Sequence, residues 1–362
     1  MRIFVVLTII LIWVFSLVNE SGLGMKLHTG EKMNWLIFIG AVYLFFIRGR
    51  RFIPKMSKAS FIGFFLFFIL IAYVVSGRWD GATYLISFLT VFCFSNIDLS
   101  AKELSVSAFA IGLLGLGLIT IYTRTQILSG WNDNSIAMLT LFSFIYFSIF
   151  FNSSQQRWIR SACWIMTFAY ISQIAGTDSR GSLLFMLLSI VMMFARETTY
   201  RFISSSTIRA LIVYFPIIIA IVVVWITSQD WFVELDNWSR LNFGKPIFNG
   251  RDELWADGFK DIINYPFGRG KFVINYHNSA VGCIGVFGIV GYVLWCNFFK
   301  RQLSALTEYL EDYTVYACMC AFILIYLQQS VELGFINRMP NMIPYMILGL
   351  GLGKVRMYES SL

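Results

Sequence analysis

Twelve apolar runs alternate with polar connectors along this chain of 362 residues, and one connector, residues 228–278, is far longer than the others. The runs lie near residues 3–18, 34–47, 60–76, 82–95, 105–122, 134–151, 157–174, 181–195, 208–227, 279–299, 313–330 and 341–354. At a rise of about 1.5 Å per residue, such runs cross or nearly cross a hydrocarbon core about 30 Å thick. The mean hydropathy is +0.70 and 13% of residues are charged, too apolar a balance for a water-soluble protein. We therefore predict an all-α polytopic membrane protein with about twelve transmembrane helices, in a single membrane domain over residues 1–362.

Lysine and arginine are distributed unevenly between the two sets of connectors. With the N-terminus placed in the cytoplasm, 16 of the 28 fall in cytoplasmic segments and 6 in the short connectors on the other side. The remaining 6 lie within 228–278, where the positive-inside rule has less weight. The bias predicts that both termini are cytoplasmic and that residues 228–278 lie on the outer, periplasmic side. It also accounts for the net charge of +8, since no basic cluster carries a nucleic-acid-binding motif.

The cysteines and acidic residues do not indicate a metal site or a disulfide framework. All six cysteines fall in apolar runs, at spacings that suit no common zinc motif. Asp252 and Glu253 are adjacent, so their side chains would point apart on a helix, and no outer connector holds an Asp-x-Asp pair. We therefore expect neither a metal nor a cofactor.

The long connector 228–278 has the composition of an ordered segment rather than of a flexible linker. Its large apolar residues include Trp231, Phe232, Trp238, Phe243, Trp255, Phe259, Ile262 and Ile263. Apolar residues recur at helical spacing over residues 251–264, with acidic residues in the first turn and Pro266 after the end. We predict an amphipathic helix there, lying along the outer membrane surface and carrying part of the active site.

Three side chains near predicted outer helix ends could carry chemistry. Arg180 begins an apolar run, and its guanidinium could bind phosphate oxygens through paired hydrogen bonds or simply pair with Asp178. Arg251 begins the predicted amphipathic helix, where the alternative is an ordinary solvated arginine. His277 precedes another apolar run and could accept a proton from a sugar hydroxyl, or only form a hydrogen bond at the membrane interface.

Short motifs around these residues resemble those of the bacterial O-antigen ligase and polymerase superfamily. In chain order they are Ser179-Arg180-Gly181, Gly250-Arg251 with Trp255, Asn264-x-Pro266-x-Gly268-x-Gly270, His277-Asn278 and Gly285-x-x-Gly288-Ile289-x-Gly291. Residues 132–137 are similar too, as is the pattern of about twelve helices with one long connector before a late helix. The motifs cover about residues 132–291. The chain departs from the family at Asp178, where a small residue is common, and its long connector is on the short side.

The resemblance implies inverting, metal-independent glycosyl transfer of the GT-C class on the periplasmic face of a bacterial inner membrane. The implied donor is a glycan linked to undecaprenyl pyrophosphate, used in the biosynthesis of lipopolysaccharide and other surface polysaccharides. Arg180 and Arg251 match the family's phosphate-binding arginines, and His277 matches its catalytic base. Further candidates for contacts with the pyrophosphate or the glycan are Arg338, Arg240, Arg269 and Asn278.

The resemblance leaves the acceptor open. We expect an O-antigen polymerase of the Wzy type, which joins lipid-linked repeat units, because the chain is compact and its long connector is of modest length. A chain-length regulator protein is a further candidate partner. The alternatives within the family are an O-antigen ligase, which transfers the glycan to lipid A-core, and a protein O-oligosaccharyltransferase. A transporter of the lipid-linked glycan is an alternative of another class. The sequence offers it only the polar group Gln328, Gln329 and Glu332 near membrane depth.

Overall fold

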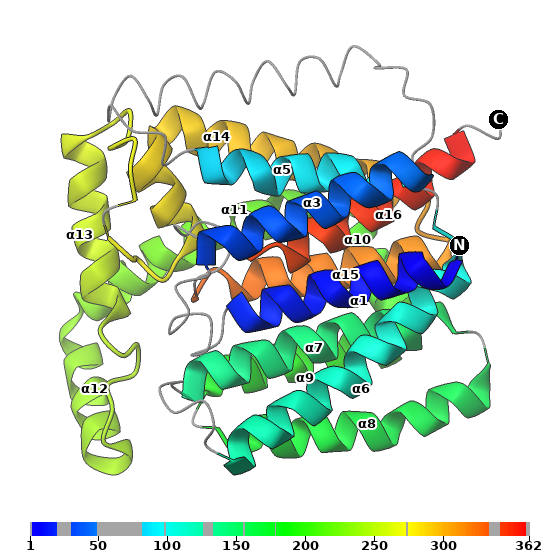
Figure 1. Cartoon of the computed structure of the whole chain (residues 1–362). Helices are drawn as coiled ribbons and strands as arrows, with labels where there is room; N and C mark the ends of the chain where they lie inside the picture. The colour runs from blue at the N-terminus through cyan, green and yellow to red at the C-terminus, as the bar shows by residue number, and fades with distance from the viewer. Residues whose placement is uncertain are drawn as a thin grey trace.

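The computed structural model describes residues 2–19, 30–48, 82–97, 99–125, 133–154, 156–177, 179–272, 274–332 and 341–359. Within these ranges, every regular element is a helix (Figure 1). The helices are α1 (Arg2–Asn19), α3 (Gly30–Arg48), α5 (Ala82–Phe94), α6 (Ala101–Thr125), α7 (Asp133–Ser153), α8 (Arg157–Ala175), α9 (Arg180–Phe194), α10 (Arg196–Ser204), α11 (Ser206–Thr227), α12 (Asp230–Phe243), α13 (Arg251–Asn264), α14 (Ser279–Thr307), α15 (Tyr313–Gln328) and α16 (Ile343–Glu359).

Eleven of the twelve predicted apolar runs coincide with helices in the described part of the chain. The remaining run, near 60–76, lies outside the described residues. Among the helices that the structure describes, four are long and apolar enough to cross a membrane: α6, α7, α11 and α14. The consecutive helices α9 and α10, bent by 101° from each other, make a fifth candidate if they form one span. For the described residues, the prediction of a helical protein with several helices able to span a membrane is thus confirmed. Twelve spans and a GT-C-like arrangement stay predictions.

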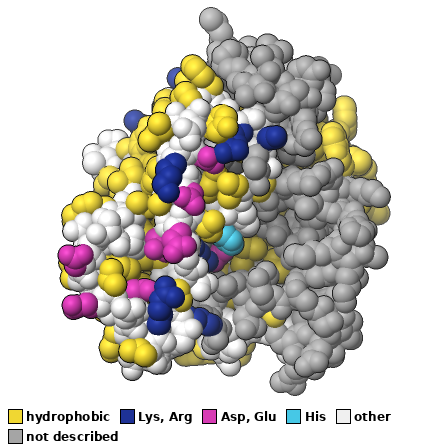
Figure 2. Space-filling view, turned by 90° about the vertical axis from the view of Figure 1, so that its left-hand side faces the viewer, with side chains coloured by type: hydrophobic (Ala, Val, Ile, Leu, Met, Phe, Trp, Pro, Cys, Tyr) yellow, Lys and Arg dark blue, Asp and Glu magenta, His cyan; other side chains and the backbone are white. Residues whose placement is uncertain are grey.

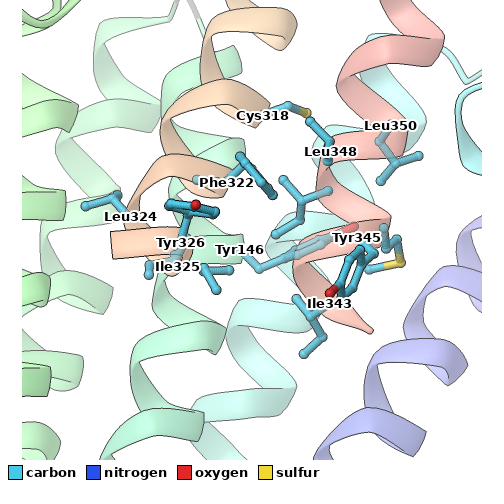
Figure 3. Packing of buried hydrophobic residues seen from close by; sticks show 14 of the residues in the cluster. Tyr146, Cys318, Phe322, Leu324, Ile325, Tyr326, Ile343, Tyr345, Leu348 and Leu350 are labelled. Atoms are coloured by element: carbon cyan, nitrogen blue, oxygen red, sulfur yellow. The ribbon is translucent and has the colours of Figure 1, made fainter. Parts of the chain in front are cut away.

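The centre of the bundle is α15, which is buried along almost its whole length. It packs against α7 and α16, and Figure 3 shows side chains of these three helices, among them Tyr146, Tyr326 and Tyr345, filling the space between them. Helices at the periphery instead expose apolar side chains, such as Phe46 of α3 and Trp225 of α11. Lipid would cover such surface, so the packing agrees with a bundle embedded in a membrane.

Two helices, α12 and α13, lie across one end of the bundle, and both ends of the chain lie toward the opposite end (Figure 1). Helix α13 has the predicted bounds, Arg251–Asn264, whereas α12 was not predicted. The apolar face of α13 packs on α11 and α14, with Trp255 and Gly258 buried and Ile263 exposed at its end. Packing on the protein therefore explains much of the amphipathic pattern, and a position along the membrane surface stays a prediction.

Helix α14 is broken at Gly288, whose backbone has a φ of 72° and a ψ of −177°. The loop 266–270, which follows α13, runs along this break. Three backbone hydrogen bonds join the two: Arg269 N–H to Gly285 O, Gly270 N–H to Val286 O, and Ile289 N–H to Pro266 O, at 2.8, 2.9 and 3.1 Å. The loop thus satisfies backbone groups that a continuous helix would pair internally. It also ties α13 to the part of α14 that follows His277.

Candidate functional site

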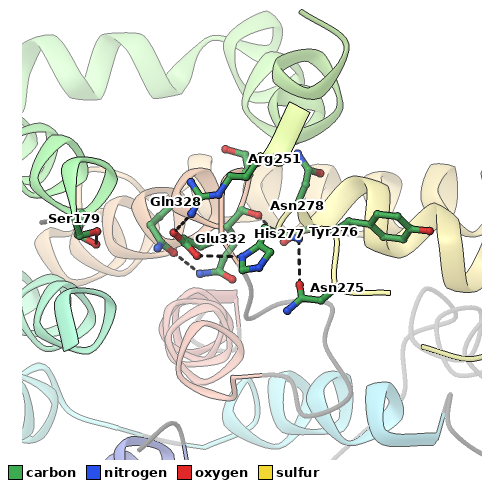
Figure 4. Close-up of polar contacts among 12 residues, drawn as sticks. Ser179, Arg251, Asn275, Tyr276, His277, Asn278, Gln328 and Glu332 are labelled. Atoms are coloured by element: carbon green, nitrogen blue, oxygen red, sulfur yellow. Dashed lines mark hydrogen bonds and ion pairs between the residues drawn. The ribbon is translucent and has the colours of Figure 1, made fainter. Parts of the chain in front are cut away.

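Three side chains that are far apart in the sequence meet where α13, α14 and α15 come together (Figure 4). The guanidinium of Arg251, the first residue of α13, donates to Oε1 of Glu332, which follows α15. Oε2 of the same carboxylate lies 3.5 Å from Nδ1 of His277, just before α14. The side chains of Arg251, Glu332 and His277 are 22%, 19% and 35% exposed, so solvent reaches each of them only in part. We refer to these three residues as the central cluster.

The turn before α13 directs Arg251 toward the cluster. Asn249 and Gly250 both have left-handed backbone conformations, with φ of 56° and 78°. Glycine and asparagine adopt this conformation more readily than other residues. The N–H of Arg251 then donates to the carbonyl of Phe248 at 3.1 Å, which closes the turn. The Asn249-Gly250 pair in the sequence is therefore explained by the abrupt entry into α13.

His277 is held by the N-terminal cap of α14. Oδ1 of Asn278 accepts from two N–H groups of the first helical turn at 2.9 and 3.0 Å. Its Nδ2 donates to the carbonyls of Pro216 in α11 and Ser330 after α15, both at 2.8 Å. Asn278 is buried, and these bonds engage both ends of its amide. This arrangement favours a structural role for Asn278, which positions His277 where α11, α14 and α15 meet.

Hydrogen bonds fasten α13 to the loop that precedes His277. Nε1–H of Trp255 donates to the carbonyl of Tyr276 at 2.7 Å. The Tyr276 hydroxyl donates to one oxygen of Asp261 at 2.6 Å, and Arg269 donates to the other at 2.5 Å. Arg269 therefore braces the loop through Asp261, and its binding to phosphate would require this ion pair to break.

Asp261 should make the stability of this loop sensitive to acid. Its burial alone would raise the carboxyl pKa, but hydrogen bonds from Tyr276 and Arg269 outweigh burial and lower the pKa. A carboxyl with a lowered folded-state pKa stabilises the fold above its unfolded pKa of about 4, and this contribution is lost as the pH falls through the folded pKa. We expect Asp261→Asn to have a lower thermal unfolding midpoint than the wild type at neutral pH. Below about pH 4, the midpoint of the variant should fall less steeply with pH than that of the wild type.

The matched control is Asp257→Asn on the same helix. Asp257 pairs with Lys260, but both side chains are largely exposed, at 66% and 72%. Water screens such a pair, so its loss should change the unfolding midpoint little. If intrinsic tryptophan fluorescence gave Asp261→Asn and Asp257→Asn the same midpoint and the same pH dependence, the proposed brace would contribute nothing to stability.

The other predicted site residues do not join the central cluster in the described structure. Arg180 is exposed at the start of α9, where its guanidinium lies over the ring of Phe243, 5.0 Å from the centroid. Arg240 pairs with Asp236 at 2.8 Å within α12. Of the predicted contacts, the structure thus brings together Arg251 and His277 and places Arg180, Arg240 and Arg269 against other partners. Asp178, a possible partner of Arg180, and Arg338, a candidate contact with the pyrophosphate or the glycan, lie outside the described residues.

Glu332 is the member of the cluster that sequence reasoning did not assign. In the sequence it belongs to a polar group at the end of an apolar run, which indicated at most a transporter. A carboxylate that is only 19% exposed is costly unless it is paired. Its partner Arg251 lies 81 residues earlier in the chain, so no local pattern signals the pair.

Figure 2 shows the face of the molecule that carries α12 and α13, with basic and acidic side chains mixed on it and a histidine among them. No group of three His, Cys, Asp or Glu side chains in the described ranges could hold a metal ion. The side chains of the central cluster themselves offer a proton acceptor, His277, beside a fixed cation, Arg251.

No protein-family model and no curated protein matches this chain.

Proposed function

We propose that this chain is a glycosyltransferase of the bacterial inner membrane that joins oligosaccharide repeat units carried on undecaprenyl pyrophosphate, as an O-antigen polymerase does. The observation that carries the proposal is the meeting of a base, His277, and a cation, Arg251, at one end of a bundle of apolar helices. The resemblance of the surrounding motifs to the O-antigen ligase and polymerase superfamily supports the same activity.

His277 is the proposed general base. Its Nδ1 is directed at Glu332, which leaves Nε2 as the nitrogen that takes up the proton of the acceptor hydroxyl. The hydroxyl oxygen attacks the anomeric carbon on the face opposite the pyrophosphate, and the new glycosidic bond forms with inversion. The bond from the anomeric carbon to the phosphate oxygen breaks, and undecaprenyl pyrophosphate leaves with the electron pair.

Arg251 and Arg180 are the proposed binding groups for the pyrophosphate. A guanidinium presents paired N–H donors that match phosphate oxygens, and it stabilises the negative charge that grows on the leaving group. Arg180 also stands at the N-terminus of α9, where backbone N–H groups favour an anion. Its guanidinium lies over the ring of Phe243, 5.0 Å from the centroid. Arg338 stays a candidate third contact.

The position of the cluster suits a donor with a lipid tail. The polyprenyl chain must remain among apolar helices while the pyrophosphate stays at the membrane boundary. Arg251, His277 and Glu332 lie at the ends of α13, α14 and α15 rather than midway along the bundle. In this proposal α12 and α13 face the periplasm, both termini face the cytoplasm, and polar groups at the boundary favour transfer over translocation.

Deletion of the gene in its own host identifies the acceptor. For a polymerase, we expect gels of lipopolysaccharide to show lipid A-core with at most one repeat unit, and the wild-type gene to restore the ladder of polymer. Bare core, with polymer accumulating on the lipid carrier, would instead identify an O-antigen ligase. An unchanged ladder in the deletion strain would contradict both activities.

A further inference from the structure

One carboxylate, that of Glu332, engages both groups on which the proposed reaction depends. One of its oxygens accepts a hydrogen bond from the Arg251 guanidinium. The other lies 3.5 Å from Nδ1 of His277, and no hydrogen bond to this nitrogen is present in the described structure. The carboxylate therefore binds Arg251, the proposed phosphate-binding residue, closely. It lies beside His277, the proposed base, without a hydrogen bond to it.

A bound pyrophosphate and Glu332 would compete for the same N–H donors of Arg251. Carboxylate and phosphate oxygens bind a guanidinium in the same way, through one or two charge-assisted hydrogen bonds. Because Arg251 and Glu332 are only 22% and 19% exposed, water screens their pairing weakly. A donor that binds Arg251 therefore has to displace the carboxylate. Once displaced, the carboxylate needs a new partner, and the imidazole of His277 is already beside it.

We propose that Glu332 is a positioning residue that exchanges partners, from Arg251 in the empty enzyme to His277 when a pyrophosphate-linked donor is bound. This inference rests on the proposed function. In the exchanged state Glu332 accepts a hydrogen bond from Nδ1–H of His277, which fixes the ring and leaves the Nε2 lone pair for the acceptor hydroxyl. As the hydroxyl proton moves to Nε2, the ring becomes a cation that the Glu332 carboxylate stabilises. The carboxylate itself accepts no proton in this step, and the proton is later released from Nε2.

The exchange predicts opposite effects of Glu332→Gln on binding and on turnover. Glutamine is close in size to glutamate but carries no charge, so Arg251 loses its competitor and should bind a pyrophosphate more tightly. The same change removes the anion that orients and stabilises the imidazole of His277, so turnover should fall. We expect about a fivefold lower Kd for a pyrophosphate and at least about a tenfold lower kcat for polymer formation.

The Kd is measured by calorimetry with the full-length protein in detergent, and farnesyl pyrophosphate is the probe. The control is Glu253→Gln, which removes the same charge from an exposed position two residues from Arg251 and should leave the Kd unchanged. In the double variant Arg251→Ala/Glu332→Gln the tighter binding should disappear. If Glu332→Gln is not recovered folded, Glu332→Asp replaces it, because the shorter carboxylate reaches Arg251 less well and should also tighten binding.

An unchanged or weaker affinity of folded Glu332→Gln for farnesyl pyrophosphate would overturn the exchange, since a merely structural role lowers binding and turnover together. The two proposals fail in distinguishable ways. The measurement of binding needs no glycosyl transfer, so it reports on competition at Arg251 even if the wild-type protein forms no polymer. If binding tightens as expected but kcat is unchanged, Glu332 competes for Arg251 without positioning His277, and the exchange is again overturned.

Discussion

Replacing His277 by alanine should abolish polymer formation while the protein remains folded in the membrane. Loss of a general base lowers the rate of a proton-transfer step by about 10²- to 10⁴-fold. The fold should tolerate the change, because the His277 side chain is 35% exposed and, in the described part of the chain, approaches only Glu332 as a charged partner. The measurement is the ladder of lipopolysaccharide from a deletion strain that carries the variant, with the amount of membrane-inserted protein determined in the same cells.

The control for this variant is Lys271→Ala, which truncates an exposed side chain in the same loop. It should restore the ladder as the wild-type gene does. A full ladder from His277→Ala at a normal amount of protein would show that another group accepts the proton. It would also favour a transporter, which has no need of a base.

Replacing Gly268 or Gly288 by alanine should cost about 3 kcal/mol or more of folding stability. A Cβ at Gly268 would lie 2.4 Å from the carbonyl oxygen of Val286, and a Cβ at Gly288 would lie 2.4 Å from the carbonyl oxygen of Pro266. Both glycines also have positive φ, at 81° and 72°, which adds strain for any other residue. The clashes are with backbone on both sides, so the loop 266–270 would have to separate from α14. We expect a much lower thermal unfolding midpoint and little protein in the membrane.

Gly117→Ala in α6 is the matched control, because a Cβ there would meet nothing within 4 Å. Alanine is the better helix former by about 1 kcal/mol in soluble helices, so this variant should be as stable as the wild type or slightly more stable. If Gly288→Ala and Gly117→Ala unfolded at the same temperature, the close pairing of the loop 266–270 with the break in α14 could not be correct.

The parts of the fold that could be predicted from the sequence depend on local signals. Helix α13 was predicted with its observed bounds because apolar residues recur there at helical spacing, acidic residues occupy the first turn and Pro266 follows the end. Helix α12 was not predicted, although Trp231, Leu235 and Trp238 recur at helical spacing; these apolar side chains are exposed and do not pack on the bundle. The break at Gly288 was not predicted either, since it is stabilised by a loop that lies about twenty residues earlier in the chain.

The candidate site was predictable in part for the same reason. Arg251 and His277 stand at helix starts, where the sequence marks them, and the structure brings them to one carboxylate. The position of Arg180 depends instead on its contact with Phe243, and the role of Glu332 depends on a partner across the fold. Asn278 was expected to contact substrate. Its side chain instead forms hydrogen bonds with Pro216 of α11, with Ser330 and with the first turn of α14, and these partners are visible only in three dimensions.

The most direct test of the central claim is glycosyl transfer by the purified protein alone. The full-length chain would be reconstituted in liposomes with labelled repeat units on undecaprenyl pyrophosphate, in the presence of a metal chelator. We predict that the wild type forms polymer on the lipid carrier and releases undecaprenyl pyrophosphate, and that His277→Ala forms none. Wild-type protein that leaves the repeat units unjoined but moves them across the bilayer would contradict the proposed glycosyl transfer and identify a transporter.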